Sequence, residues 1–293
     1  MRRARRRATT TLATLVALGA LVALGACGGD DSSGPLPPLY RIAGAAGTTY
    51  IYGTLHLGVE TDELPGGVLD ALDASASAAF ESTVPASEQS LFREATRLPA
   101  GEKTLEALLG AEAWAKLRAL LPDAAPTELS ALRPWAAGTA IFQDRFATKR
   151  PIDPTLEARA RDSGSTVIYL EHWRAQVDPL NAVPIADGVA SLLQLVDGID
   201  AVLAAYAKLR SAYLGGDDTR LWQLAPEAGA MPALGTPLYQ RFIADRNQRW
   251  LDAIAKAADE GGWFVAVGFA HLLGDQGVLA LLERRNISAE RVR

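Results

Sequence analysis

The pattern of apolar and polar positions along the chain predicts β-strands at several places. An unbroken apolar run over 263–267 follows a pair of glycines and is typical of a strand buried on both faces. β-branched and aromatic residues predict another strand over 166–171 and a hairpin with arms at 39–43 and 49–53. A weaker strand pattern covers 75–81. Strands therefore occur at both ends and in the middle of the chain.

Helical patterns connect these strands. The expected helices cover residues 67–72, 87–147 with breaks at four prolines, 154–162, 184–214, 237–258 and 275–285, and a short strand is expected over 287–292. Asp153 and Pro154 are typical of an N-cap followed by proline at the first helical position. The alternation predicts an α/β fold, with a central mixed sheet, flanking helices and a large helical insertion. One domain, residues 39–293, is the simplest organisation.

The first 38 residues do not follow the pattern of a folded domain. Five arginines precede an apolar run of about 15 residues, which is shorter than a membrane-spanning helix and suits a secretory signal. Small residues then precede Cys27, and glycine, serine and proline follow it. This order resembles a bacterial lipobox, which implies a signal peptide over 1–26, a lipidated Cys27 and a flexible tether over 27–38. A plain signal peptide with an incidental cysteine is the alternative.

Composition and charge narrow the choice of partners. The chain has 293 residues, 49% hydrophobic and 22% charged, which is enough apolar mass for a large core. Removing residues 1–26 takes away five arginines and no acid, so the formal charge changes from −5 to −10. An acidic body argues against nucleic acid, whose phosphates need a cationic surface. The predicted partners are a peptide or small-molecule substrate and, through the lipid anchor, a membrane of the cell envelope. Gly28 in place of aspartate favours the outer over the inner membrane.

The three histidines, His56, His172 and His271, limit where imidazole chemistry can occur. Two of them share a Gly-x-x-His pattern, Gly53 to His56 and Gly268 to His271, and each of these patterns ends a predicted strand. Ligands collect at the carboxyl ends of strands in open α/β sheets, and glycine leaves room beside the ring. A single such histidine is usually a satisfied core or surface group. The repeated pattern favours one shared site.

Two carboxylates end predicted strands in the same way. Glu81 follows the weak strand and is either at the rim of the sheet or solvated, and Glu171 follows the strong strand. Two histidines and a carboxylate can bind a divalent metal and leave a position open for water. The metal would lower the pKa of that water, and a spare carboxylate could act as general base. These ligands would come from distant strands, so spacing alone does not fix their geometry.

One helical face combines apolar and polar residues. Ile243, Asn247, Trp250 and Ile254 follow helical spacing. Asn247 interrupts this apolar stripe, and a buried amide needs partners, so Asn247 either braces a loop or faces a polar site. Arg246 lies at the edge of the stripe, where a surface ion pair is the simpler expectation.

The motifs together carry a family resemblance. In chain order they are 52–58 (YGTLHLG), Glu81, Ile152-Asp153, Leu170-Glu171, Gln176, 245–247 (DRN) with Trp250, 267–272 (VGFAHL) and 277–282 (GVLALL). From about residue 40 to 292 this order resembles the TraB/GumN family, which includes the PrgY pheromone-shutdown proteins and the Tiki metalloproteases. The resemblance implies an α/β fold with paired Gly-x-x-His motifs and, in the Tiki branch, a divalent-metal-dependent peptidase.

The resemblance also implies roles for individual residues. His56 and His271 would be metal ligands or catalytic bases, and Glu81 would be the acidic group, as ligand or base. Arg246 and Asn247 would steady the substrate or the oxyanion of a tetrahedral intermediate. The supporting positions are Gly53, Gly268, Asp153 and Glu171. His172 has no counterpart in the motifs.

These inferences predict a lipid-anchored hydrolase of the bacterial cell envelope. Its foremost form is a metallopeptidase in which Mn²⁺, Co²⁺ or Zn²⁺ activates a water that attacks a carbonyl. The alternative is a non-catalytic lipoprotein that binds haem or metal, as the distantly similar ChaN-like haem-binding lipoproteins do, or that sequesters a peptide without turnover. The combined histidine, glutamate, arginine and asparagine set favours the enzyme, because a binder needs fewer polar groups.

Overall fold

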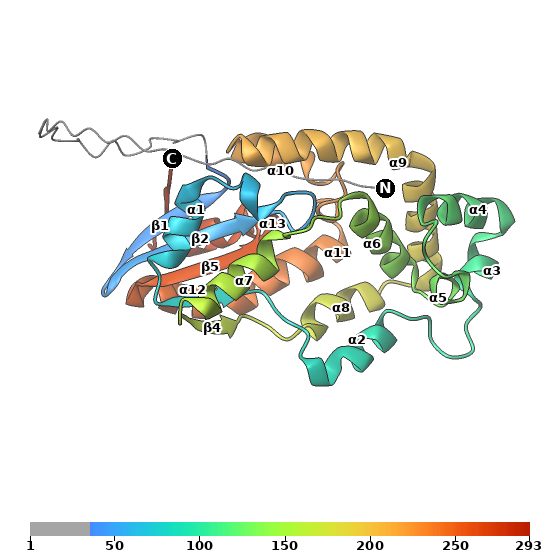
Figure 1. Ribbon diagram of the computed structural model, residues 1–293, viewed down its shortest axis with the longest axis horizontal. Coiled ribbons are helices and arrows are strands. Elements are labelled where there is room, and N and C mark those ends of the chain that lie inside the picture. The colour runs from blue at the N-terminus through green and yellow to red at the C-terminus, as the bar shows by residue number, and fades with distance from the viewer. Residues whose placement is uncertain (1–35) are drawn as a thin grey trace, which may run out of the picture. The chain divides into compact units, whose positions relative to one another are not determined.

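The computed structural model describes residues 36–293, which contain a six-stranded mixed sheet in the order β4-β3-β5-β2-β1-β6 (Figure 1). The strands are β1 (Leu39–Gly44), β2 (Gly47–Thr54), β3 (Ser77–Phe80), β4 (Thr166–Tyr169), β5 (Trp263–Gly268) and β6 (Glu290–Arg291). β4, β3, β5 and β2 are parallel, whereas β1 pairs antiparallel with β2 and with β6. The α/β fold with a central mixed sheet is therefore confirmed.

The length and burial of each strand follow from its place in the sheet. β5 lies between β3 and β2, and all of its residues after Trp263 are buried, as the apolar run predicts. β4 is an edge strand whose side chains alternate between exposed and partly buried, and it ends at Tyr169, earlier than the sequence pattern suggests. The central strand therefore anchors the sheet.

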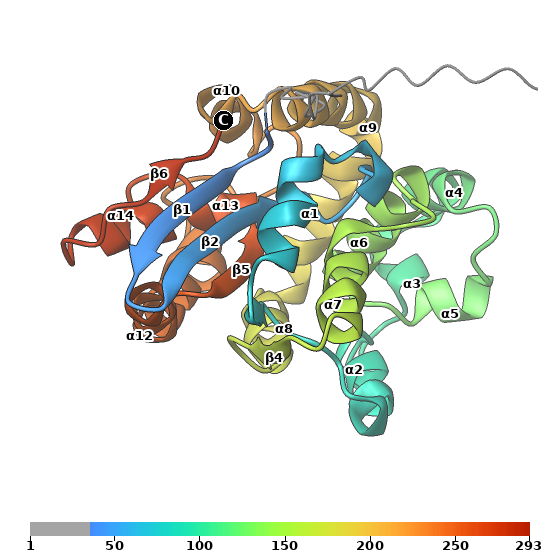
Figure 2. The same cartoon turned by 60° about the vertical axis from the view of Figure 1, so that its left-hand side comes forward.

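Helices from the strand connections cover both faces of the sheet (Figure 2). α1 (Gly66–Asp73) connects β2 to β3, α7 (Ile152–Asp162) precedes β4, and α12 (Asp245–Glu260) precedes β5. From β2 the chain moves toward one edge of the sheet, first to β3 and then to the edge strand β4. It then turns back to form β5, which lies between β3 and β2. Because crossovers between parallel strands are right-handed, α1 and α7 lie on one face and α12 on the other. The reversal makes the carboxyl end of β5 a topological switch point, where open α/β sheets bind ligands.

Helical segments are inserted after β3 and after β4, and some of them build a second apolar cluster. After β3 they are α2 (Gln89–Ala95), α3 (Leu105–Leu109), α4 (Ala111–Leu120), α5 (Pro126–Ser130) and α6 (Pro134–Arg145). After β4 they are α8 (Arg174–Asn181), α9 (Ile185–Leu214), α10 (Asp218–Leu224) and α11 (Pro237–Tyr239), and a π-helical turn, η3 (Gln240–Ala244), precedes α12. This confirms the predicted large helical insertion.

The long helix α9 joins the two cores. Leu192 and Val196 in its first half pack in the cluster of inserted helices, whereas Leu209 and Tyr213 pack in the core around the sheet. In the described part of the chain, α9 is also a helix long and apolar enough to cross a membrane by length and composition. Because each half of α9 is buried in a different core, α9 attaches the inserted helices to the sheet. This attachment positions α6 and α9 beside the strand ends.

Three further details differ from the sequence prediction. The N-cap prediction for Asp153 is wrong, because α7 begins at Ile152 after Pro151, and the Asp153 carboxylate binds Thr54 and His56 instead. The helix expected over 275–285 is shorter, α14 (Val278–Glu283). The short helices α8, α10 and α13 (Phe269–Leu272) have too few turns to produce a clear sequence period.

Short 3₁₀ turns at Thr61–Glu63 and Ala86–Glu88 complete the elements of residues 36–293. The predicted signal peptide over 1–26, Cys27 and most of the tether over 27–38 lie outside the described residues. Lipidation and export therefore stay predictions.

Candidate active site

Three parallel strands, β2, β3 and β5, bring their carboxyl ends to one pocket of about 650 Å³, and the carboxyl end of β4 lies beside that of β3. His56 follows β2, Glu81 follows β3, and Glu171 follows β4. Gly268 ends β5, and His271 lies on α13 immediately after it. The two Gly-x-x-His motifs thus meet because β2 and β5 are neighbours in the sheet, although about 200 residues separate them in the chain.

Glu81 is the centre of the site. Its Oε1 accepts a hydrogen bond from the Gly268 N–H at 2.6 Å. Its Oε2 accepts from Arg246 Nη2 at 2.6 Å and from Gln176 Nε2 at 3.1 Å. Burial disfavours the charged form, but the basic side chains around the carboxylate and the Gly268 N–H outweigh it and hold the pKa of Glu81 well below its usual range. Glu81 is therefore an ionised carboxylate at neutral pH.

His56 presents one ring nitrogen to the pocket. Its Nδ1 lies 3.0 Å from Asp153 Oδ2, and Asp153 Oδ1 accepts a hydrogen bond from the Thr54 hydroxyl at 2.9 Å. Its Nε2 lies 3.8 Å from Glu81 Oε1, and 55% of its side chain is exposed. Partial desolvation of the ring by the surrounding protein opposes protonation, but the carboxylates of Asp153 and Glu81 outweigh it and raise the pKa of His56 to about 9. At neutral pH His56 is an imidazolium whose Nε2–H is open to the pocket.

Arg246 is a buried ion-pair hub. Its side chain is 1% exposed, which overturns the expectation of a surface ion pair. The Nε and Nη2 groups donate to Glu171 and Glu81, at 2.6 to 2.8 Å. Nη1 lies 3.1 Å from the Phe242 carbonyl and 2.9 Å from His271 Nε2. These contacts occupy the whole guanidinium fork, so Arg246 holds Glu81 in place.

His271 and Asn247 form a relay behind Arg246. His271 Nε2 accepts from Arg246, so its Nδ1 carries the proton and donates to Asn247 Oδ1 at 2.7 Å. Asn247 is buried, and its Nδ2 donates to the Gln276 carbonyl at 2.8 Å. Burial, together with the positive charge of Arg246, lowers the pKa of His271 to about 3. Asn247 therefore both braces a loop and faces the polar site, the two alternatives that its sequence position left open.

Glu171 completes the ion-pair network. Its Oε1 pairs with Arg246, and its Oε2 accepts from Trp250 Nε1 at 3.1 Å. The side chain is 6% exposed, and this burial raises the pKa of Glu171 above its usual value. The Arg246 guanidinium carbon also lies 4.7 Å from the centre of the Trp250 ring. Glu171 therefore supports Arg246 without reaching the pocket lining.

The expected three-ligand metal set can be compared with this geometry. His56 Nε2 and His271 Nε2 lie 3.8 and 4.0 Å from Glu81 Oε1. However, an Arg246 N–H already occupies the Nε2 lone pair of His271, and its guanidinium charge lies where a cation would bind. Within residues 36–293, no group of three His, Cys, Asp or Glu side chains has the arrangement of a metal site. The set does not fit a three-ligand centre in this arrangement, and metal binding stays a prediction.

Several residues of the site were not selected from the sequence. Gln176 carried the family resemblance but had no assigned role, and it donates to Glu81. Thr54 lies inside the first Gly-x-x-His motif and orients Asp153. Phe242 belongs to the π-helical turn. This turn contains more residues than an α-helical turn, so the spacing of apolar residues that identifies an α-helix does not predict it. His172 bonds Glu88 and does not line this pocket, in agreement with its omission.

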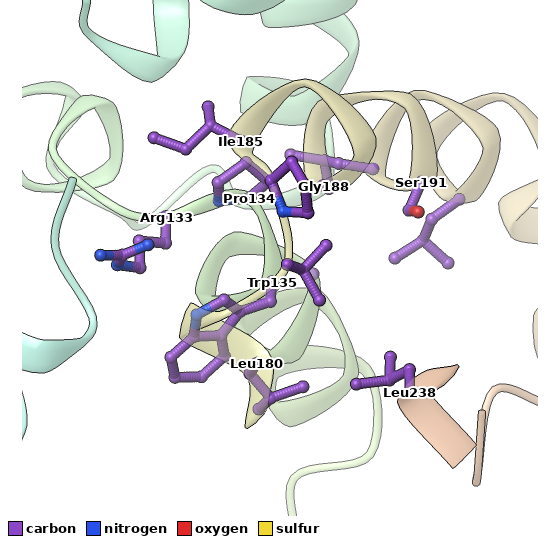
Figure 3. A pocket seen from close by; sticks show the side chains of 13 residues that line it. Arg133, Pro134, Trp135, Leu180, Ile185, Gly188, Ser191 and Leu238 are labelled. Atoms are coloured by element: carbon purple, nitrogen blue, oxygen red, sulfur yellow. The ribbon is translucent and has the colours of Figure 1, made fainter. Parts of the chain in front are cut away.

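A second, smaller cavity of about 160 Å³ lies between α6, the α8–α9 connection and Leu238 (Figure 3). Its lining residues include Pro134, Leu180 and Ile185, and the full set of lining residues contains no histidine, aspartate or glutamate. This cavity therefore lacks groups for acid–base chemistry, and the pocket at the strand ends is the candidate site.

The motif glycines allow close packing at the pocket floor. A Cβ on Gly53 would lie 3.0 Å from Leu272 Cδ1 and from the Phe269 backbone. A Cβ on Gly268 would lie 2.7 Å from His56 Nε2 and 3.3 Å from Glu81 Oε1. Gly53 therefore seats α13 against β2, and Gly268 leaves space for the two charged groups.

We expect Gly268→Ala to lower any activity of this pocket by about tenfold or more, because the methyl group displaces the His56 ring and a misplacement of about 1 Å has effects of this size. Gly268 has a φ of −53°, which alanine adopts without strain, so the variant should fold. Circular dichroism and turnover measure the two effects. A variant with unchanged turnover would contradict this role of Gly268.

Comparison of the sequence with models of known protein families gives a match over nearly the whole chain. A family model described as TraB/PrgY/gumN matches residues 38–291. The chain belongs to the TraB/PrgY/gumN family. Every motif that carries the resemblance, from residue 52 to 282, lies within this match, so the predicted membership is confirmed. Comparisons with curated proteins and with solved structures give no significant match. Membership of the TraB/PrgY/gumN family does not by itself assign an activity.

Proposed function

We propose that this pocket is the active site of a hydrolase that cleaves an acyl bond, in a peptide or an ester, at the cell envelope. The observation that carries the proposal is the pairing of Glu81 Oε1 with His56 Nε2, which lie 3.8 Å apart at the floor of the pocket. A carboxylate and an imidazolium at this distance can both bind one water or one substrate oxygen. Separate networks, through Arg246 and through Asp153, hold the two groups.

The two groups divide the proton transfers of hydrolysis. Glu81 accepts a proton from a water whose oxygen forms a bond to the carbonyl carbon. His56 donates its Nε2 proton to the leaving nitrogen or oxygen as the acyl bond breaks. After these transfers Glu81 carries a proton taken from the water, and His56 has given its proton to the leaving group. Release of the Glu81 proton to solvent and uptake of one by His56 restore both groups. The Asp153 carboxylate stabilises the imidazolium and fixes its orientation.

The predicted divalent metal is a separate part of the proposal. When bound, Mn²⁺, Co²⁺ or Zn²⁺ would supply a more acidic water. Glu81 Oε1 faces the pocket as a donor, His56 Nε2 would become one on losing its proton, and His271 would first have to lose its contact with Arg246. Thermal unfolding of the full chain with each ion and with EDTA tests this part. No shift in Tm with any ion, in wild type or in His56→Ala, contradicts metal binding.

Hydrolysis itself is tested with the full chain on p-nitrophenyl acetate and on a fluorogenic peptide. We expect turnover that His56→Ala lowers by about 10²-fold or more. His172→Ala is the matched control, because His172 bonds Glu88 and does not line the pocket, and it should keep full activity. Equal rates for all three proteins, or no turnover, would contradict the proposal. A Soret band with haemin that is lost in His56→Ala would instead support the haem-binding alternative.

The pH dependence distinguishes the role of His56 as an acid from a role as a base. Its pKa is raised to about 9 by Asp153 and Glu81 against the effect of burial, so the imidazolium persists through neutral pH. If His56 donates a proton, kcat/KM stays level near neutrality and falls as pH rises through about 9. A profile that rises through about 9 would show that neutral His56 is the active form and would overturn the proton assignment.

A further inference from the structure

The candidate pocket has two chemically different halves. Its floor comes from the strand ends and α7 and carries the charged groups. Its walls come from the inserted helices: Phe142 lies on α6, Tyr206 on α9, and Phe242 and Ile243 on the π-helical turn η3. Since the floor accounts for the proposed bond cleavage, the walls are left to contact the rest of a substrate.

The aromatic wall is rigid and tied to the catalytic loop. The rings of Phe146 and Tyr206 stack at 3.9 Å between centres, and Phe142 lies 6.0 and 6.2 Å from these two rings. The Tyr206 hydroxyl donates to the carbonyl of Leu57, next to His56, at 3.0 Å. A Cβ on Gly229 would lie 2.8 Å from Phe142, so the loop opposite packs tightly on that ring. The wall is a preformed apolar surface beside the reacting groups.

The floor offers little to a charged substrate. Of the basic residues that line the pocket, Arg246 has its guanidinium fork occupied by Glu81, Glu171 and two further acceptors, and His271 is held by Arg246 and Asn247. His56 remains, and it faces the carboxylates of Asp153 and Glu81. A substrate carboxylate would therefore meet acidic groups with a single cation among them, and an ammonium would displace an established pair.

We propose that the pocket takes uncharged acyl compounds whose acyl group is an apolar chain or ring, with the carbonyl at Glu81 and His56 and the acyl group along Phe142, Tyr206 and Phe242. This inference rests on the proposed hydrolase function and adds its substrate class. Each methylene of the acyl group that is buried on such a wall raises affinity or kcat/KM about fourfold. The inserted helices would thus select the acyl group, and the strand ends would perform the reaction.

A variant that narrows the wall tests this inference. Thr139 lies one turn before Phe142 on α6, is exposed, and lines the same pocket. Thr139→Phe should fill the apolar half without disturbing the core or touching Glu81 and His56. Thr127→Phe is the matched control, because Thr127 is also exposed on a helix but lines none of the cavities described above.

The full chain is assayed with p-nitrophenyl acetate, butyrate and octanoate, and its binding of acetamide and hexanamide is measured by calorimetry. We expect kcat/KM to rise about tenfold or more from acetate to octanoate, and Thr139→Phe, but not Thr127→Phe, to abolish that rise. Tighter binding of hexanamide without any ester turnover supports the substrate class and contradicts the hydrolase. Equal kcat/KM for all esters, or equal binding of the two amides, overturns the substrate class.

Discussion

Glu81→Gln is expected to lower kcat/KM for acyl hydrolysis by about 10³-fold, within the usual range for loss of a positioned proton-transfer group. The amide cannot accept a proton from water, whereas the carboxylate is ionised at neutral pH because nearby basic groups and the Gly268 N–H hold its pKa low despite burial. The side chain lines the pocket, and His56 Nε2 lies 3.8 Å from its Oε1.

The substitution should leave the fold intact. Glutamine has nearly the shape of glutamate, and Arg246 keeps its pair with Glu171. The single amide oxygen can accept from Gly268 or from Arg246 but not from both, so one donor loses its acceptor at a cost of about 1–3 kcal/mol. Glu112→Gln is the control, since Glu112 is 87% exposed in a surface pair with Lys116. Circular dichroism and steady-state kinetics are compared for the two variants. If Glu81→Gln retains more than about a tenth of the wild-type kcat/KM, Glu81 is not the proton acceptor.

Arg246→Met is expected to destabilise the protein by about 3–5 kcal/mol, the usual cost of removing one partner of a buried ion pair. Methionine leaves the carboxylates of Glu81 and Glu171 without their shared cation, and both are largely buried, with 11% and 6% exposure. It also leaves His271 Nε2 and the Phe242 carbonyl without a donor. The loss therefore combines unpaired charge and unmade hydrogen bonds.

Urea unfolding monitored by circular dichroism measures this loss, with Arg41→Met as the control. Arg41 pairs with Glu290 on the surface, where side-chain exposures of 53% and 69% limit the pair to about 0–1 kcal/mol. The contribution of Glu81 in the wild type is present above its unfolded pKa and is lost as pH falls through its lowered folded pKa. The deficit of Arg246→Met should therefore be largest near neutral pH. A deficit equal to that of Arg41→Met would contradict the ion-pair hub.

The two experiments separate chemistry from support. Glu81→Gln should remove activity at a smaller cost in stability, whereas Arg246→Met should remove more stability and, with it, the positioning of Glu81. Gln176 belongs to the second group, because its amide bonds the same Glu81 oxygen as Arg246. In the proposed mechanism Glu81 and His56 act on the substrate, and Arg246, Asn247, Glu171 and His271 support Glu81.

Local pattern predicted the elements that carry the site. The apolar run of β5 and the hairpin of β1 and β2 follow from residues that are neighbours in sequence, because burial on both faces and a tight turn leave periodic signals. The order of the motifs was sufficient for family membership, which the match over residues 38–291 confirms. The recurrence of Gly-x-x-His at two strand ends indicated one shared site, and β2 and β5 do lie side by side.

Local pattern failed where a side chain has a distant partner. Asp153 is a good N-cap residue by sequence, yet its carboxylate binds Thr54 and His56, which lie about 100 residues earlier in the chain. Arg246 is charged and borders a polar segment, which favours the surface, yet Glu81 and Glu171, which follow β3 and β4, make its burial favourable. Neither partner is visible from spacing along one helix.

By itself, then, the sequence determined the α/β architecture, the candidate histidines and Glu81, and the family. The tertiary structure alone decided what these groups do: it protonates His56 beside Asp153, turns His271 into a neutral acceptor of an Arg246 N–H, and places aromatic residues of the insertion over the strand ends. The physical reason is that protonation state and hydrogen-bond direction depend on the charges and dipoles within a few ångströms, and the fold brings those groups from all parts of the chain.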